Sequence, residues 1–301
     1  MRLAFIILSH KNPQQLCRLL GQLQHPNIDC YVHLDAKAAI TDWDLAASLQ
    51  QVYFIRERVN VTWAGYGTIQ AALNGIEAVN NSGKKYGFLH LISAQDYPLV
   101  KAEVLYDFFS RHEGVQFLDL LPAADLQRVM SKITQWHFED LPLPGKYRIS
   151  RMLNKLLPPR KHPLQLKVYG GSLWWSLTQE CATWCLTYVK AHPTLQRFYR
   201  YTWGGDEFIF QTIIMNSPFR KTVCNNYLRY IDWSEGNAHP KTFGMNDLEN
   251  IVKSGQLLAR KFDEEKTPGL LDKIDAMANN VANYTLRPSF FQSVLNPPVK
   301  P

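Results

Sequence analysis

The chain has 301 residues, of which 46% are hydrophobic and 20% are charged, a balance typical of a soluble globular protein and unlike that of a disordered one. It contains no run of about 18 apolar residues that would span a membrane, and its first apolar stretch, residues 3–8, is not followed by the small-residue cleavage site of a signal peptide. We therefore expect a cytoplasmic protein, and the net charge of +7 favours an anionic partner such as phosphate, nucleic acid or an acidic membrane.

The first third of the chain alternates between strand and helix patterns. Short apolar runs predict buried strands, and apolar residues at helical spacing follow them. This alternation predicts an α/β fold with a mostly parallel central sheet flanked by helices. The predicted strands are residues 3–8, 30–35, 52–55 and 88–92, and the predicted helices begin at Pro13, cover residues 42–51 and 67–80, and include Leu105, Phe108 and Phe109.

Two aspartates follow predicted strands. Asp35 closes the strand 30–35, and Asp96 comes shortly after the strand 88–92. Because parallel sheets bind ligands at the carboxyl ends of their strands, both are predicted binding residues. The alternative is that each merely caps the turn that follows.

Aromatic residues are denser in the second half. Residues 169–178 contain a Gly-Gly turn and then a predicted aromatic strand, in which Trp174 and Trp175 point to opposite faces. One of the two is expected in the core, and the other is free to stack on a sugar ring. Residues 227–233 predict another strand, and residues 257–263 place Arg260 and Lys261 on an otherwise apolar run.

The segment 199–212 places Asp206 and Glu207 where a Gly-Gly turn meets an apolar run. Glycine lets a ligand approach the backbone closely, and a carboxylate there faces the positive end of a helix dipole. Either residue is suited to take a proton from a substrate hydroxyl. The alternative, a simple helix cap, is the interpretation that the local pattern alone favours, because capping carboxylates are far commoner than catalytic ones.

A basic segment lies between Lys146 and Lys167, with seven Lys or Arg residues and no Asp or Glu. Met152, Leu153, Leu156 and Leu157 interleave with the charges, which is typical of an amphipathic helix. The segment is interpreted as a membrane-surface helix, as the lining of an acceptor groove, or as a solvated helix face.

Together the motifs resemble those of the core-2/I-branching and peptide O-xylosyltransferase family (glycosyltransferase family 14), and five segments occur in that family's order. The resemblance extends from about residue 3 to residue 265. It implies a GT-A-type fold and inverting transfer of a sugar from a UDP-sugar to an acceptor hydroxyl without a metal. The five segments are Val61–Tyr66, Ser93–Pro98, Gly170–Trp174, Asp206–Phe208 and Ala259–Asp263.

The family's functional residues transfer to matching positions. The resemblance implies that Glu207 is the catalytic base, that Arg260 and Lys261 hold the diphosphate, and that Asp35 lies in the uridine pocket. Because neighbours on a strand point to opposite faces, Arg260 and Lys261 reach one phosphate only if the strand ends or kinks there. Further predicted donor contacts are Asp96 and Lys241, and predicted substrate contacts are Ser172, Trp174, Asp206 and Trp233.

No metal ligand or other cofactor is predicted. The Asp-x-Asp sequence Asp42–Asp44 opens a predicted helix, where aspartate is favoured as a cap. A metal motif is expected at the end of a later strand, and the segment there, Ser93–Asp96, holds a single carboxylate, whereas hard-ion sites usually need at least two converging oxygens. Leu173 stands where animal xylosyltransferases tend to carry an acidic residue, which argues against xylose as donor.

The sequence therefore predicts one GT-A-like domain over residues 1–290, with a nucleotide-binding half (1–120), an acceptor and catalytic half (121–290) and a Pro-rich tail (291–301). We expect a bacterial-type member that transfers GlcNAc or xylose in surface-glycan or polysaccharide synthesis, and the basic segment can bring it into peripheral contact with an anionic membrane. One alternative is a non-catalytic glycan- or nucleic-acid-binding protein that uses residues 146–167, although no nucleic-acid motif is present. The other is a glycoside hydrolase, which needs two carboxyl groups flanking one bond.

Overall fold

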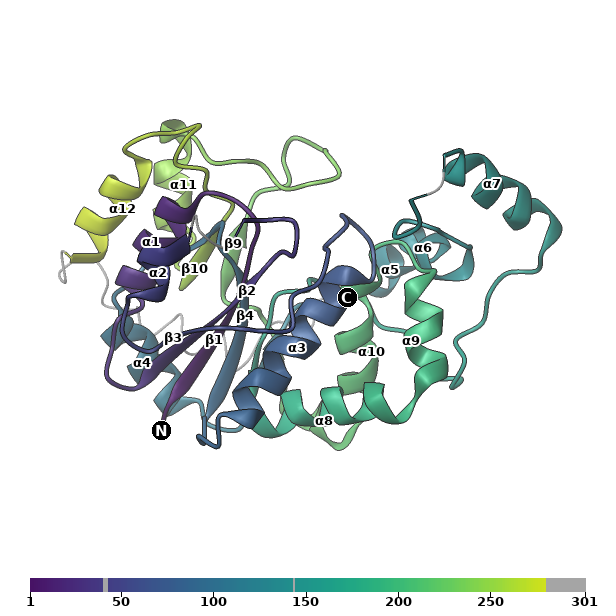
Figure 1. The fold of residues 1–301 in the computed structure, drawn as a ribbon, viewed down its shortest axis with the longest axis horizontal. Coiled ribbons are helices and arrows are strands. Elements are labelled where there is room, and N and C mark those ends of the chain that lie inside the picture. Colours follow the sequence, from purple (N-terminus) through teal and green to yellow (C-terminus); the bar gives the residue numbers. More distant parts are fainter. Residues whose placement is uncertain (40–42, 143, 280–301) are drawn as a thin grey trace.

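The protein is built around a seven-stranded, mostly parallel sheet, and the computed structural model describes residues 1–39, 43–142 and 144–279 (Figure 1). Its strands are β1 (Leu3–Ser9), β2 (Ile28–Leu34), β3 (Val52–Phe54), β4 (Phe88–Ser93), β6 (Gln116–Leu118), β7 (Ser176–Thr178) and β8 (Val223–Asn225). Their order is β3-β2-β1-β4-β7-β6-β8, and β7 runs antiparallel to both of its neighbours. The predicted α/β fold, with a mostly parallel central sheet flanked by helices, is confirmed.

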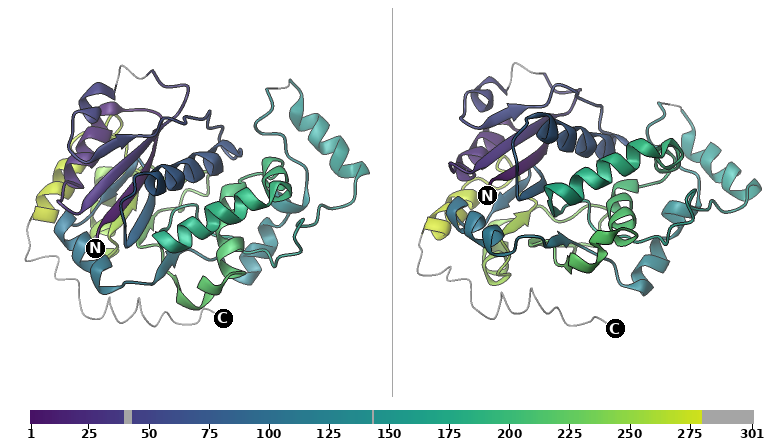
Figure 2. Two further views of the ribbon diagram at one scale, coloured as in Figure 1. Left: turned by 60° about the horizontal axis from the view of Figure 1, so that its bottom comes forward. Right: turned by 90° about the horizontal axis from the view of Figure 1, so that it is seen from below.

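Alternating side chains of the strands feed two separate cores. In β1, Leu3, Phe5 and Ile7 belong to one hydrophobic cluster, and Ala4 and Ile6 belong to the other, as the two-residue period of a strand requires. Helices cover both faces of the sheet (Figures 1 and 2). The first cluster includes side chains of α1 (Pro13–Gln22), α4 (Ala102–Arg111), α11 (Leu248–Lys253) and α12 (Leu270–Asn279), and the second those of α3 (Gly67–Asn81), α8 (Gln179–Ala191), α9 (Pro193–Arg200) and α10 (Ile209–Met215).

A second, three-stranded sheet begins just beyond the carboxyl end of β4. It consists of β5 (Asp96–Pro98), β10 (Leu258–Arg260) and β9 (Arg229–Ile231), in the order β5-β10-β9. The register pairs Arg260 with Asp96 across β10 and β5. This small sheet therefore brings residues from distant parts of the chain to the end of β4.

Three predicted elements are shorter than the sequence patterns suggested. The expected strand 227–233 is only β9, and it begins no earlier than Arg229 because Leu228 has a left-handed backbone (φ 58°). The aromatic strand begins only at Ser176, so Trp174 and Trp175 precede β7. The expected helix 42–51 is the four-residue α2 (Asp44–Ala47), and Asp42 lies outside the described residues.

The segment between β6 and β7 extends away from the sheets (Figures 1 and 2). It contains α5 (Ala123–Val129), α6 (Ser131–Thr134) and α7 (Lys146–Leu156). Short 3-10 helices are η2 (Gly205–Glu207), η3 (Pro218–Thr222) and η4 (Met245–Asp247). Among the helices of the described ranges, none is long and apolar enough to cross a bilayer. The predicted division at residue 120 stays a prediction, and the tail 291–301 lies outside the described residues.

Candidate functional site

Charged residues follow the carboxyl ends of β1, β2 and β4, the edge at which the sequence predicted a site. His10 and Lys11 follow β1, and Asp35 and Lys37 follow β2. Burial lowers the pKa of His10; Lys11, Lys37 and Lys261 lower it too, while Asp35 opposes them. The edge of the sheet therefore gathers several cations around few carboxylates.

Asp35 is buried and bonded to two loops. Its Oδ1 accepts a hydrogen bond from the backbone N–H of Lys37 (2.9 Å), and its Oδ2 accepts one from the N–H of Val61 (3.3 Å). The Lys37 ammonium lies 3.6 Å from the same carboxylate. Asp35 thus caps its turn, as the alternative held, and also fixes the start of the segment 61–66.

Asp96 lies at the centre of a buried ion cluster. Its Oδ2 accepts hydrogen bonds from the Ser93 N–H (2.8 Å) and Oγ (2.6 Å). The Arg229 Nε is 2.5 Å from Oδ1, and the Arg260 Nη1 is 3.6 Å from Oδ2. Because Asp96 has no exposed surface, its direct role is to hold the two guanidinium groups.

Two buried guanidinium groups thus share one carboxylate, which leaves an excess of positive charge. Burial lowers the pKa of Arg229 and of Arg260, and Asp96 opposes that effect. The Nε and Nη1 atoms of both arginines are buried and form no aligned hydrogen bond with the described residues. The Trp174 ring covers this pair, with its centroid 4.2 Å from Arg260 Cζ and 5.7 Å from Arg229 Cζ. The arrangement is suited to accept an anion.

Lys261 continues this cationic surface. Strand β10 ends at Arg260, which meets the condition that the sequence set for both residues to act at one site. Burial lowers the pKa of Lys261; Arg260, Lys266 and Lys11 lower it as well, and Asp263 opposes them. The predicted Lys241 instead donates from its ammonium to Asp247 (2.7 Å), and only its carbonyl contacts Lys261, accepting a hydrogen bond from the N–H.

The segment 170–174 connects the arginine pair to the Asp206-Glu207 turn. The Gly171 N–H donates to the Glu207 carbonyl (2.8 Å), and a Cβ at Gly171 would lie 1.9 Å from the Asp119 carbonyl oxygen. Only glycine fits there. Three residues later, Trp174 covers Arg260. At most about 10 Å of chain therefore separates the residue that contacts Glu207, Gly171, from the residue that covers Arg260. The Ser172 carbonyl accepts a hydrogen bond from Gln211 (2.5 Å), and its Oγ lies 3.4 Å from the Trp174 N–H.

Glu207 ends η2 with its side chain 37% exposed. The Lys132 Nζ donates a hydrogen bond to its Oε2 (2.6 Å) and also lies 4.5 Å from the Trp203 ring centroid. The edge of the Trp63 ring meets Trp203 at 5.0 Å, and Trp63 is 58% exposed. The Ala64 carbonyl accepts a hydrogen bond from the Gly204 N–H (2.8 Å), so the segment 61–66 joins this turn to Asp35.

The sequence did not single out Lys132, Arg229 or Trp63 as site residues. Lys132 and Glu207 are 75 residues apart in the chain, and no local pattern connects them. Trp63 lies within the quoted segment Val61–Tyr66, which was the one available signal for it.

Asp206 has a perturbed carboxyl group. Burial and the neighbouring Glu207 raise its pKa to about 7, while a hydrogen bond from its own backbone N–H and the charge of Lys132 oppose that rise. A Cβ built on Gly204 would lie 3.6 Å from the Glu207 Oε2 and 4.0 Å from the Asp206 Oδ1. The two carboxyl groups therefore lie over the same glycine in different surroundings: Lys132 pairs with Glu207, whereas burial raises the pKa of Asp206.

The other predicted residues lie apart from this centre or within the core. Trp233, 52% exposed, is in the loop after β9, whose ends are joined by a hydrogen bond from the Lys241 N–H to the Asp232 carbonyl (2.9 Å). Trp175 is fully buried and packs on Phe210. Trp174 covers Arg260, and its predicted stacking on a sugar stays a prediction.

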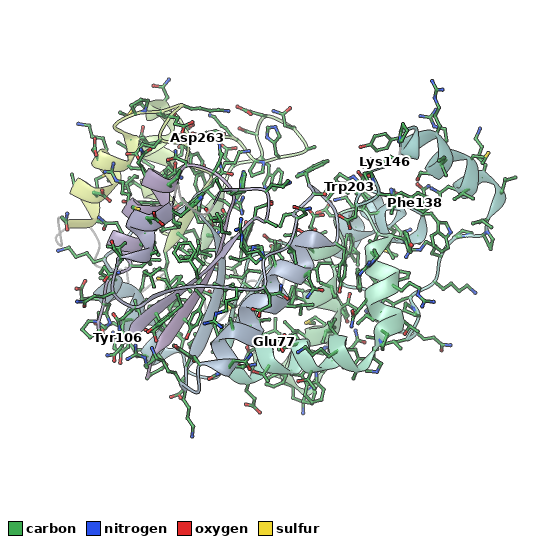
Figure 3. All side chains as sticks on the ribbon, viewed as in Figure 1. Glu77, Tyr106, Phe138, Lys146, Trp203 and Asp263 are labelled. Carbon is green, nitrogen blue, oxygen red and sulfur yellow. The ribbon has the colours of Figure 1, made fainter. Side chains whose placement is uncertain are left out.

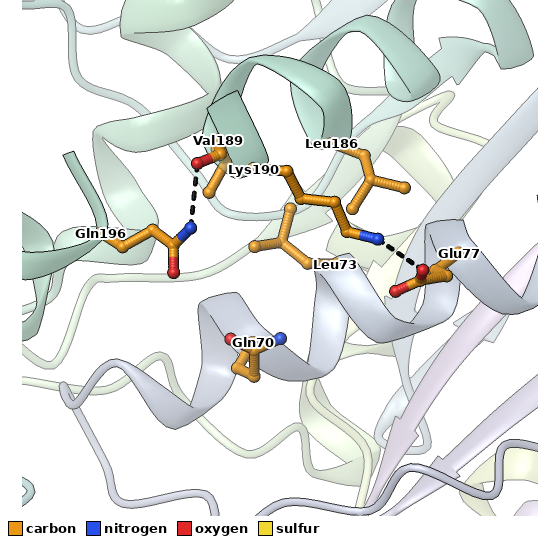
Figure 4. Close-up of a pocket in the computed structure, with 7 residues that line it drawn as sticks. All are labelled: Gln70, Leu73, Glu77, Leu186, Val189, Lys190 and Gln196. Atoms are coloured by element: carbon orange, nitrogen blue, oxygen red, sulfur yellow. Dashed lines mark hydrogen bonds and ion pairs between the residues drawn. The ribbon is translucent and has the colours of Figure 1, made fainter. Parts of the chain in front are cut away.

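No three His, Cys, Asp or Glu side chains converge as possible metal ligands within residues 1–39, 43–142 and 144–279. A small hollow between α3 and the helices α8 and α9 is lined by Gln70, Leu73, Glu77 and Lys190, among others, and Lys190 pairs with Glu77 across it (Figure 4). Glu77 is eight residues along α3 from Ile69, which contacts Gly205, so it lies about 12 Å from the turn. The Lys190–Glu77 pair is therefore separate from the site. In Figure 3, Glu77 likewise appears well apart from Trp203.

The sequence profile described as Core-2/I-Branching enzyme matches residues 3–253. Beta-glucuronosyltransferase GlcAT14A of Arabidopsis thaliana is 27% identical over 295 residues, covering 91% of this chain and 63% of its own length. Xylosyltransferase 2 of Rattus norvegicus is 25% identical over 300 residues, covering 91% of this chain and 33% of its own length. The chain thus spans less than two thirds of the length of these relatives.

Solved structures overlap more loosely. Galactosyltransferase LgtC in complex with donor and acceptor sugar analogs has a TM-score of 0.40 at 9% identity, covering 93% of this chain and 95% of its own. Mouse xyloside xylosyltransferase 1 has a TM-score of 0.33 at 12% identity, covering 71% of this chain and 81% of its own. Overlaps at this level carry no argument about the site.

Proposed function

This chain belongs to the Core-2/I-Branching enzyme family, and from that premise we propose that it is an inverting glycosyltransferase that uses a UDP-sugar and needs no metal. The observation that carries the proposal is the pair of buried guanidinium groups, Arg229 and Arg260, that share the single carboxylate Asp96. A site with excess fixed positive charge at the carboxyl edge of the strands is suited to a leaving diphosphate.

In the proposed reaction, the Glu207 carboxylate takes the proton of the acceptor hydroxyl. The acceptor oxygen then forms a bond to the anomeric carbon, while the bond from that carbon to the diphosphate oxygen breaks and UDP leaves from the opposite face. Glu207 is accessible, and Lys132 holds its carboxylate in place. Trp63 and Trp203, beside Lys132, offer aromatic surface for an acceptor sugar.

In the same proposal, fixed cations replace the metal that would otherwise neutralise the leaving group. Arg260 and Lys261 contact the diphosphate, Arg229 supports them through Asp96, and Asp35 orders the loops around the nucleotide. Arginine suits this role because its guanidinium group can bind two phosphate oxygens at once. Lys241, which is paired with Asp247, contributes at most through its main chain.

The choice of donor sugar rests on the sequence and on the relatives, and not on the geometry of the site. The sequence favoured GlcNAc over xylose at Leu173, whereas the relatives named above are a glucuronosyltransferase and a xylosyltransferase. We propose a donor among these three UDP-sugars and a hydroxyl-bearing glycan acceptor in surface-glycan synthesis. The five cysteines form no disulfide among the described residues, which supports a reducing compartment.

The test is a UDP-release screen with UDP-GlcNAc, UDP-xylose and UDP-glucuronic acid, each in the presence of EDTA and again with Mn²⁺. We expect one donor to release UDP, with the same turnover in both conditions. Activity only with Mn²⁺ would contradict metal independence, and absence of UDP binding by calorimetry would contradict the donor site itself.

A further inference from the structure

Helix α7 presents an unusual surface, because none of its 11 residues is buried. The helix lies at the end of the segment that extends from the body, far from the central sheet in each view (Figures 1 and 2). Its apolar side chains are exposed: 39% of Ile149, 56% of Met152 and 73% of Leu156. An apolar helix face of this kind requires a partner to cover it.

The exposed residues form two adjacent stripes. Ile149, Met152 and Leu156 follow the spacing i, i+3, i+7 of one helix face, and the partly buried Leu153 lies within it. Arg148, Arg151 and Lys155 are exposed at the same spacing one position earlier, so the basic stripe lies about 100° from the apolar one. The segment from Lys146 to Lys167 contains no Asp or Glu that would neutralise it.

A third face fixes the helix to the protein and leaves these stripes free. The Asn154 side chain accepts a hydrogen bond from the Trp136 N–H (2.7 Å) and donates one to the Trp136 carbonyl (2.9 Å), to which Ser150 also donates. Arg160 stacks on the Trp136 ring, with its Cζ 4.8 Å from the centroid. The orientation of α7 is therefore set by polar contacts and not by burial of its apolar stripe.

We propose that α7 docks this protein on an anionic lipid surface, with Ile149, Met152 and Leu156 inserted among the acyl chains. The basic stripe then meets the lipid phosphates, since a helix with one aliphatic and one cationic face lies in the plane of an anionic membrane. Eleven residues extend about 16 Å, too little to cross a bilayer core of about 30 Å, so the helix lies on the surface. Nucleic acid fits less well, because the stripe is aliphatic and the one exposed ring of α7, Tyr147, lies outside it.

The lipid surface also suits the location of the helix. The main chain at Trp136, on which α7 is fixed, is four residues from Lys132, which pairs with Glu207. Figure 3 shows Lys146, at the start of α7, in the same part of the molecule as Trp203. The helix proposed to meet the membrane is thus fixed next to the segment that carries Lys132, the partner of the proposed base.

The experiment is flotation of the full chain with phosphatidylcholine vesicles and with vesicles that also contain phosphatidylglycerol. We expect binding only to the anionic vesicles, and weaker binding as salt is added. The triple variant Arg148→Gln, Arg151→Gln, Lys155→Gln should lower the partition coefficient about 100-fold, since each cation near an anionic surface contributes about fivefold.

A matched control removes the same charge elsewhere. The control is the triple variant Arg111→Gln, Arg220→Gln, Lys221→Gln, at three exposed positions outside α7. It should bind nearly as well as the natural chain. An equal loss in this control would overturn the proposal, because it would assign binding to the overall charge. Failure of the natural chain to float with anionic vesicles, or equal binding to RNA at the same salt, would also overturn it.

A second variant tests the apolar stripe. Met152→Ser with Leu156→Ser keeps every charge, and both positions are exposed, so the fold should persist with unchanged UDP affinity. We expect this variant to lose most vesicle binding even at low salt. If it floats as well as the natural chain, the helix does not insert and the proposal is wrong.

Discussion

The raised pKa of Asp206 makes a quantitative prediction about stability. In the folded protein this pKa is about 7, against an ordinary value of 3.8, because the carboxyl group is desolvated and lies beside Glu207. The folded state therefore holds a proton that the unfolded state releases between these two values. When folding raises the pKa of a carboxyl group in this way, the free energy of unfolding is highest below about pH 4 and falls as the pH rises towards 7.

The variant Asp206→Asn removes this cost. The full shift of about three pKa units corresponds to about 4 kcal/mol, and we discount it for solvent screening because the side chain is only partly buried. We expect the free energy of unfolding of the variant, relative to that of the natural chain, to increase by about 1–2 kcal/mol between pH 5 and pH 8. Urea unfolding at both pH values measures it, and Asp107→Asn, at an exposed position on α4, is the control. A difference that stays flat with pH, or that shrinks, would refute the reasoning.

Two further predictions concern Gly171, in the segment that connects the arginine pair to the Asp206-Glu207 turn, and the cation Lys261. Gly171→Ala should lower the free energy of unfolding by about 2 kcal/mol or more, because the added Cβ would overlap the Asp119 carbonyl. Thermal unfolding measures this loss. The control is Gly21→Ala, which should not be destabilising because no atom lies within 4 Å of the added Cβ. Lys261→Ala should weaken UDP binding about tenfold or more, since it removes one charge-assisted contact, and calorimetry that finds unchanged affinity would exclude this residue from the diphosphate site.

The first half of the fold could be predicted from the sequence because its signals are local. The runs that became β1, β2 and β4 are mainly apolar, as is typical of strands covered on both faces, and nearly all of their residues are buried. Once these strands are parallel, Asp35 and Asp96 necessarily fall near one edge. The length of β9 was overestimated, because the left-handed Leu228 delays the start of the strand to Arg229 with no Gly or Pro to signal it.

The ion pairs of the site could not be predicted in the same way. Asp96 meets Arg229 only because β5, β10 and β9 assemble into one sheet, and Lys132 meets Glu207 only because α6 folds back on η2. These contacts depend on tertiary packing, for which a single sequence carries no periodic signal. For the same reason the sequence did not show that Asp96 is buried between two arginines, and its predicted contact with the donor stays a prediction.

The central claim is that Glu207 is the base of a sugar transfer, and the most direct test is the turnover of Glu207→Gln beside Asp206→Asn. General-base catalysis contributes about 10²–10⁴-fold, so we expect Glu207→Gln to lose turnover by that factor while its UDP affinity stays nearly unchanged. Asp206→Asn should keep most of the activity. Normal turnover in Glu207→Gln, or a loss confined to Asp206→Asn, would contradict the account.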